Sequence, residues 1–225
     1  MTSNQDLSDP IAPERMIAFS DAVVAIAITL LILPLVGLEL PDGDPNPLQT
    51  IWTNNYALIL SFLITWAVII SFWLTHNRLF RMFENIDQAV ILWNLVWLFA
   101  IIVLPFPMNL ANQLTDNGNS IPINSVTAFY IGTMAVLSIS LTMMQRETRR
   151  RPDLLTEAAR LSGPRNGFGS WAMAGYLVLL TLLAFFIGNN ILYALLGLPL
   201  IPWLDSFINQ PRRQQAHSES AAQSE

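Results

Sequence analysis

Residues 15–36 of the chain read RMIAFSDAVVAIAITLLILPLV. As an α-helix rising about 1.5 Å per residue, the 21 residues from Met16 to Val36 reach roughly 31 Å, enough to cross the hydrocarbon of a bilayer. An acid, Asp21, nevertheless stands about one and a half turns inside this helix, next to Ser20. An ionised carboxylate that faces lipid costs roughly 2.5–3.5 kcal/mol. The stretch therefore predicts a membrane-spanning helix whose acid points at protein or at water.

A helical wheel gives this helix two different faces. With about 100° per residue and Ile26 at zero, Leu30 falls at about 40° and Leu33 at about −20°. We call these three residues the aliphatic stripe, and Ala22 and Thr29 lie at its edge. Asp21 and Ser20 lie about 140° and 120° from Ile26, so a polar patch occupies a separate face. In the ordinary interpretation the stripe faces lipid or the protein core, and the polar patch bonds to a neighbouring helix. In the alternative interpretation the stripe lines a conduit.

The composition of the whole chain is that of a membrane protein. Of its 225 residues, 53% are hydrophobic and 12% are charged, and the mean hydropathy is +0.45. The chain contains no cysteine, which excludes disulfides, thiolate metal sites and cysteine catalysis. It also has no basic stripe with interleaved aromatic residues, so nucleic acid is not an expected partner.

Six apolar runs predict six transmembrane helices in an all-α membrane protein. They cover about residues 16–36, 56–75, 89–104, 123–144, 171–187 and 191–208. A polar bridge that begins at His76 separates the second run from the third, and residues 145–170 are predicted to form a solvated loop with a short helix at 153–161. We expect a cytoplasmic N-terminus at 1–14, one membrane domain at 15–208 and a disordered cytoplasmic tail at 209–225.

The basic residues predict the orientation of these helices. All 11 are arginines, and they occur before the first run, after the second, fourth and sixth runs, and in no other segment. Because positively charged loops remain on the cytoplasmic side, both termini are expected in the cytoplasm. This topological role accounts for the loop arginines, with binding of lipid headgroups as the alternative.

His76 is one of two histidines, and it lies at the cytoplasmic end of the second run, at the depth of Asp21. A hydrogen bond between His76 and Asp21, or a contact from Arg15 to Asp21, would satisfy the buried acid. A packing latch between helices is therefore the preferred interpretation of His76, ahead of proton transfer. The membrane segments offer no metal-ligand group, nucleophile elbow, phosphate loop or dinucleotide fingerprint, so neither an enzyme nor a bound cofactor is expected.

Two sets of residues carry a resemblance to a known family. The first set is Arg15, Phe19, Ser20 and Asp21, which spell R-x-x-x-F-S-D and are followed by a threonine and Leu-Leu-x-Leu-Pro. The second set is Trp73, His76, Phe80 and Asp87, followed by LWNL at 92–95 and LPFP at 104–107. Both resemble the transmembrane protein 175 family of potassium channels, in particular its bacterial members with one repeat per chain. The resemblance implies a homotetramer with four copies of the first helix around a central pore, Ile26 as the main constriction, and Leu30 and Leu33 further along.

The residues themselves favour transport through a channel. Prolines stand at helix ends rather than in mid-membrane, and Asp21 is the one acid well inside an apolar run, which argues against a proton-coupled secondary transporter. The chain has no T-V-G-Y-G filter, so selectivity would come from pore width and lining, with apolar side chains that gate by dewetting. Together with the family resemblance, which implies the ion and the bacterial source, this leads us to expect a potassium-preferring cation channel of a prokaryotic inner membrane that conducts K⁺. A proton-coupled transporter and a non-conducting membrane scaffold are the alternatives. Ala25 stands where the family often has serine, which weakens the expectation of strong potassium selectivity.

Overall fold

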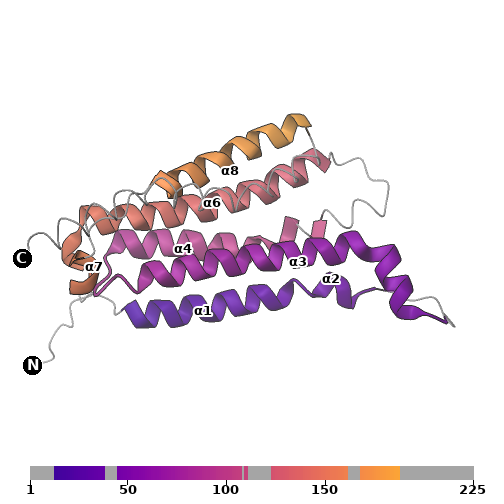
Figure 1. The fold of residues 1–225 in the computed structure, drawn as a ribbon, viewed down its shortest axis with the longest axis horizontal. Helices are drawn as coiled ribbons and strands as arrows, with labels where there is room; N and C mark the ends of the chain where they lie inside the picture. Colours follow the sequence, from indigo (N-terminus) through magenta and orange to yellow (C-terminus); the bar gives the residue numbers. More distant parts are fainter. Residues whose placement is uncertain (1–12, 39–44, 108, 111–122, 162–167, 188–225) are drawn as a thin grey trace, which may run out of the picture.

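A computed structural model describes residues 13–38, 45–107, 109–110, 123–161 and 168–187, and within them the chain is helical. The elements are α1 (Pro13–Leu30), α2 (Leu33–Val36), α3 (Pro47–Phe80), α4 (Gln88–Val103), α6 (Ile123–Arg150), the 3₁₀ turn η1 (Pro152–Leu154), α7 (Glu157–Leu161) and α8 (Phe168–Ile187). The long helices lie alongside one another with alternating direction (Figure 1). Helix α6 packs most extensively against α4 and α8, and α1 contacts both α3 and α4.

The membrane class predicted from the sequence is confirmed. Within the described residues, four helices are long and apolar enough to span a bilayer, namely Pro13–Val36, Leu58–Phe80, Gln88–Pro107 and Ser125–Arg150. A shorter apolar segment, Gly169–Ala184, corresponds to the fifth predicted run. The sixth predicted run, the N-terminal segment 1–12 and the tail from 209 lie outside the described residues.

The first predicted helix is not continuous. It breaks at Leu31 and Ile32, whose backbone N–H groups bond three residues back, to Ile28 and Thr29. Pro34 has no N–H group to continue the α-helical pattern, and the short helix α2 starts beside it. Leu33 therefore belongs to a separate turn of helix, whereas the helical wheel treated it as part of one helix with Ile26.

Helix α3 is longer than the second apolar run at both of its ends. It begins at Pro47, where the missing N–H costs nothing because first-turn N–H groups have no helical partner. A non-helical residue, Asn55, kinks it before the apolar span begins. At the other end the helix continues to Phe80, so the predicted polar bridge at His76 is wrong, and His76 belongs to the helix.

The expected solvated loop after residue 144 is also mostly structured. Helix α6 continues to Arg150, and the segment after it lies against the turn between α3 and α4. There, the N–H groups of Glu84 and Asn85 both donate to the Leu154 carbonyl, at 2.8 and 3.2 Å, and the N–H of Thr156 donates to the Met82 carbonyl at 3.0 Å. The expected helix at 153–161 is η1 followed by α7, and these bonds join the first four helices to the second half of the chain.

The arginines gather at one end of the bundle. The start of α1, the end of α3, the end of α6 and helix α7 lie at the same end (Figure 1). These elements and the segments next to them carry eight arginines: Arg15, Arg78, Arg81, Arg146, Arg149, Arg150, Arg151 and Arg160. This is the distribution that the positive-inside argument requires, whichever side of the membrane that end occupies.

Candidate functional site

Helix α1 presents two chemically different faces. Ser20, Val24, Ala27 and Leu31 are almost completely buried against the rest of the subunit. Ser20 and Ala27 on this face are small and allow the neighbouring helices to approach closely. The opposite face is left uncovered, so the helix is anchored along one side only.

The aliphatic stripe lies on the uncovered face. Ile26, Leu30 and Leu33 are 61%, 42% and 57% exposed, and Ala22 and Thr29 at its edge are exposed as well. The hydroxyl of Thr29 donates to the Ile26 carbonyl at 2.7 Å. The stripe is therefore no part of the subunit's core, which removes one of the two ordinary interpretations and leaves lipid or a shared axis.

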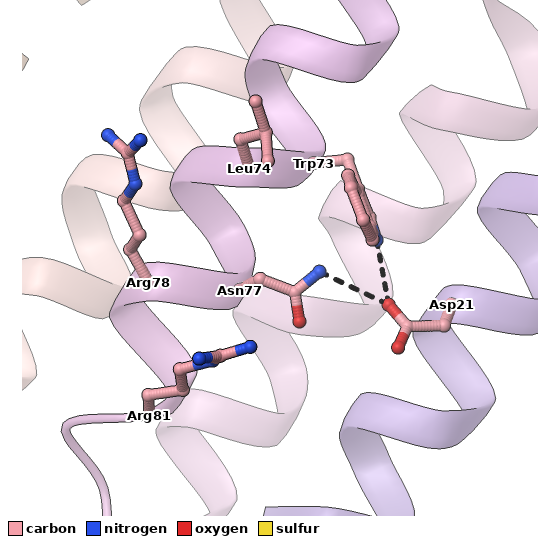
Figure 2. Close-up of a pocket in the computed structure, with 6 residues that line it drawn as sticks. All are labelled: Asp21, Trp73, Leu74, Asn77, Arg78 and Arg81. Atoms are coloured by element: carbon pink, nitrogen blue, oxygen red, sulfur yellow. Dashed lines mark hydrogen bonds between the residues drawn. The ribbon is translucent and has the colours of Figure 1, made fainter.

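Asp21 is half-buried between α1 and α3. Its Oδ1 accepts hydrogen bonds from Trp73 Nε1 at 2.7 Å and from Asn77 Nδ2 at 3.3 Å (Figure 2). The prediction of a bond from His76 to Asp21 is wrong, because Trp73 and Asn77 lie one turn apart on α3 and occupy the side that faces Asp21. Arg15 makes no ion pair with Asp21 either, and it remains exposed at the start of α1.

His76 belongs to a second, fully buried chain of polar groups. Its Nε2 lies 2.7 Å from Asn94 Oδ1, and Asn94 Nδ2 donates to Ser20 Oγ at 3.1 Å. Because the amide nitrogen of Asn94 donates to Ser20, the amide oxygen accepts, and Nε2 is the nitrogen of His76 that carries the proton. The chain joins α1, α4 and α3 through one side chain each.

Aromatic rings hold His76 in place. Its ring stacks on Phe80 and on Trp97, with centroids 4.4 and 4.1 Å apart. His76 Nδ1 and Trp97 Nε1 are buried without a hydrogen-bond partner. One hydrogen bond and two stacked rings therefore position the imidazole.

The sequence alone indicates no role for three residues of these clusters: Trp73, Asn77 and Asn94. Trp73 and Asn94 stand out only as part of the family resemblance. A signal for Asn94 was present, because it is a lone amide in a strongly apolar run and therefore needs a partner. Helix α1 takes part in two polar clusters on its inner face, one through Asp21 and one through Ser20. Both fix the rotation of α1 about its own axis, and in that orientation the aliphatic stripe faces outward. In the part of the chain that the structure describes, no group of three or more His, Asp or Glu side chains could hold a metal ion.

Residues 15–105 match the family model described as "Endosomal/lysosomal potassium channel TMEM175". A potassium channel of Streptomyces collinus is 30% identical to the chain over 164 residues, which cover 69% of this chain and 76% of that protein. The chain belongs to the TMEM175 family. A potassium channel of Chamaesiphon minutus is 29% identical over 152 residues, covering 64% of this chain and 70% of the relative.

Vertebrate members of the TMEM175 family are much longer. The zebrafish (Danio rerio) relative, named an endosomal/lysosomal proton channel, is 28% identical over 127 residues, or 56% of this chain. The matched part is about a quarter of that protein, at 24% of its length. This chain therefore spans only one portion of the vertebrate protein, so the activity of the whole vertebrate protein is not transferred to it.

Solved TMEM175 structures share the fold of this chain. The crystal structure of a potassium-selective TMEM175 homologue from Chamaesiphon minutus aligns with a TM-score of 0.55 at 23% identity, covering 86% of this chain and 97% of that one. A variant of the potassium channel MtTMEM175 aligns with a TM-score of 0.56 at 17% identity, covering 97% and 99%. The family predicted from the R-x-x-x-F-S-D motif is thus confirmed, together with an all-helical fold of the membrane type.

Proposed function

We propose that four copies of this chain form a potassium-preferring cation channel in a prokaryotic inner membrane, with both termini in the cytoplasm. In this proposal α1 of each subunit lines a central pore. Ile26 forms the main constriction, Leu30 and Leu33 continue the apolar lining, and Ala22 and Thr29 lie at its edge. The bacterial relatives named as potassium channels support the choice of ion.

The exposed stripe on an otherwise anchored helix is the observation that carries this proposal. A pore-lining helix must be fixed on one side by its own subunit and free on the other, where symmetry-related copies meet. Helix α1 meets both conditions, because Ser20 and Asp21 are bonded inward while Ile26 is exposed. A ring of isoleucines narrows the path and gates it by dewetting, and because the chain has no carbonyl filter, selectivity in this proposal comes from the width and lining of the pore.

The experiment replaces Ile26 with asparagine and compares ion flux in liposomes. A polar ring at the constriction would lower the barrier to hydrated ions, so we expect larger K⁺ flux and weaker preference for K⁺ over Na⁺. Ile102→Asn is the matched control, because Ile102 is also a membrane-helix isoleucine and is 54% exposed, on α4. Equal and small effects of the two substitutions would place Ile26 in lipid and refute the pore assignment.

Proton conduction is the second candidate, favoured by the vertebrate relatives that are named proton channels. Asp21 and His76 are ionisable groups in membrane-spanning segments, but their bonds hold them on the inner side of α1, away from the aliphatic stripe. Flux measured separately for K⁺, Na⁺ and H⁺ distinguishes the candidates. Flux along each ion's own gradient indicates a channel, flux that requires a second ion indicates a coupled transporter, and no flux indicates a scaffold.

A further inference from the structure

A pocket of about 290 Å³ opens between the end of α3 and helix α1. Its lining residues are Asp21, Trp73, Leu74, Asn77, Arg78 and Arg81 (Figure 2). The pocket lies at the end of the bundle where the arginines gather. It is separate from the aliphatic stripe, because Asp21 is on the opposite side of α1.

The charges of this pocket favour an anion. It holds two guanidinium groups and one carboxylate, and both hydrogen bonds of that carboxylate come from Trp73 and Asn77. Among the described residues, the side chain of neither Arg78 nor Arg81 forms an ion pair or a hydrogen bond, and both are exposed. Figure 2 shows Arg78 on the wall away from Asp21, and Arg81 below Asn77 with its guanidinium turned toward Asp21. Arg78 and Arg81 are three positions apart at the end of α3, and their exposed side chains are long enough to turn toward one phosphate, which arginine binds through paired N–H donors.

The apolar surface beside the pocket favours a lipid as the source of that phosphate. Leu74 lines the pocket and is 42% exposed, and the same side of α3 continues away from the arginines with Leu63 and Leu60, which are 48% and 53% exposed. Leu60 and Leu63 are three positions apart, and Leu63 precedes Leu74 by eleven positions, or about three turns, so the three leucines lie as an apolar strip along one side of a membrane-spanning helix. An acyl chain can follow the strip while its headgroup phosphate reaches the guanidinium groups.

We propose that this pocket binds the phosphate group of an anionic phospholipid at the arginine-bearing surface of the membrane. Arg78 and Arg81 hold the phosphate, and Leu74 contacts the start of an acyl chain. The proposal is independent of the channel function, because it concerns lipid retention by the folded protein. A soluble phosphate ester is the other source of the same chemistry, and the experiment separates the two.

The test counts lipids that remain bound to the purified protein by native mass spectrometry. Phosphatidylglycerol is the anionic probe, phosphatidylcholine the zwitterionic one and glycerol 3-phosphate the soluble one. We expect the double variant Arg78→Gln/Arg81→Gln to retain phosphatidylglycerol about tenfold more weakly than the unchanged protein, with no change for phosphatidylcholine. Displacement by glycerol 3-phosphate at the concentration of the lipid would instead support recognition of a soluble ester and overturn the lipid assignment.

Arg146→Gln is the control, because Arg146 is exposed at the same end of the bundle but on α6. It should retain phosphatidylglycerol like the unchanged protein, and an equal loss in this variant would show unspecific attraction to arginine and refute the pocket. Should the double variant fail to assemble, Leu74→Trp decides, because it fills the pocket and keeps both arginines. Undiminished retention in Leu74→Trp would also refute the proposal.

Discussion

Replacing Asn94 with leucine should destabilise the subunit by about 2 kcal/mol. Asn94 is fully buried and is the only link between His76 on α3 and Ser20 on α1 in the described chain of polar groups. Leucine has the same branching at Cγ but neither donates nor accepts hydrogen bonds. The substitution therefore removes both hydrogen bonds and keeps an apolar side chain of related shape between the helices.

Most of this loss in unfolding free energy should come from His76, which is left without a hydrogen-bond partner. Ser20 can return its hydroxyl to its own helix by bonding the carbonyl four residues back. The ring of His76 has no such choice, because Nδ1 already lacks a partner and Nε2 would lose its only one. A buried polar group left unpaired costs about 1–3 kcal/mol, whereas hydrogen bonds between membrane helices average about 0.6 kcal/mol because the unfolded chain also finds partners. About 2 kcal/mol follows when the loss at His76 is added to that at Ser20.

The free energy of unfolding can be measured by titrating bicelle-embedded protein with sodium dodecyl sulfate. Tryptophan fluorescence reports the transition, since Trp97 stacks on His76. Asn54→Leu is the matched control, because Asn54 is an exposed asparagine of α3 that precedes the apolar span, and it should change the stability by less than about 0.5 kcal/mol. Ser20→Ala should cost about 0.5–1 kcal/mol, because it leaves the His76 bond intact. A value for Asn94→Leu no larger than that for Asn54→Leu would refute the reasoning that this chain of bonds anchors α1.

Three further outcomes are expected. Asp21→Ala leaves an indole and an amide donor without their acceptor, so it should lower the yield of assembled protein in size-exclusion chromatography, and full assembly with normal flux would remove the anchoring role. Tyr130→Phe deletes the 2.9 Å contact to Thr65 between α6 and α3, and should lower the unfolding free energy by about 0.5–1.5 kcal/mol in the same detergent titration. Arg151→Gln should change the free energy of unfolding by less than about 0.5 kcal/mol, because Arg151 is exposed and its contact to Asp87 is long, at 3.8 Å. A larger loss would mean that this ion pair is stronger than its geometry indicates.

The second apolar run, at residues 56–75, is shorter than the helix to which it belongs, α3. Hydropathy detects the part of α3 that matches the bilayer and stops where polar residues begin, at His76. The helical backbone continues past that point because a helix can extend beyond the apolar layer without unfolding. His76 can lie in the protein interior because its Nε2 pairs there with the side-chain amide of Asn94. The predicted polar bridge at His76 is wrong for this reason.

The sequence by itself determined the membrane class, the apolar spans, the family motif and the two faces of the first helix. These properties are local or periodic, and they depend on the 3.6-residue repeat and on the cost of placing charge in lipid. The partners of the polar groups were decided only by the tertiary structure. A shift of one turn along α3, about 5.4 Å, exchanges Trp73 and Asn77 for His76 or another neighbour, and no pattern within one helix specifies how far it slides or rotates against the next. Packing of α1 against α3 and α4 made that choice, and it thereby placed Asp21 and Ser20 inside and left Ile26 outside.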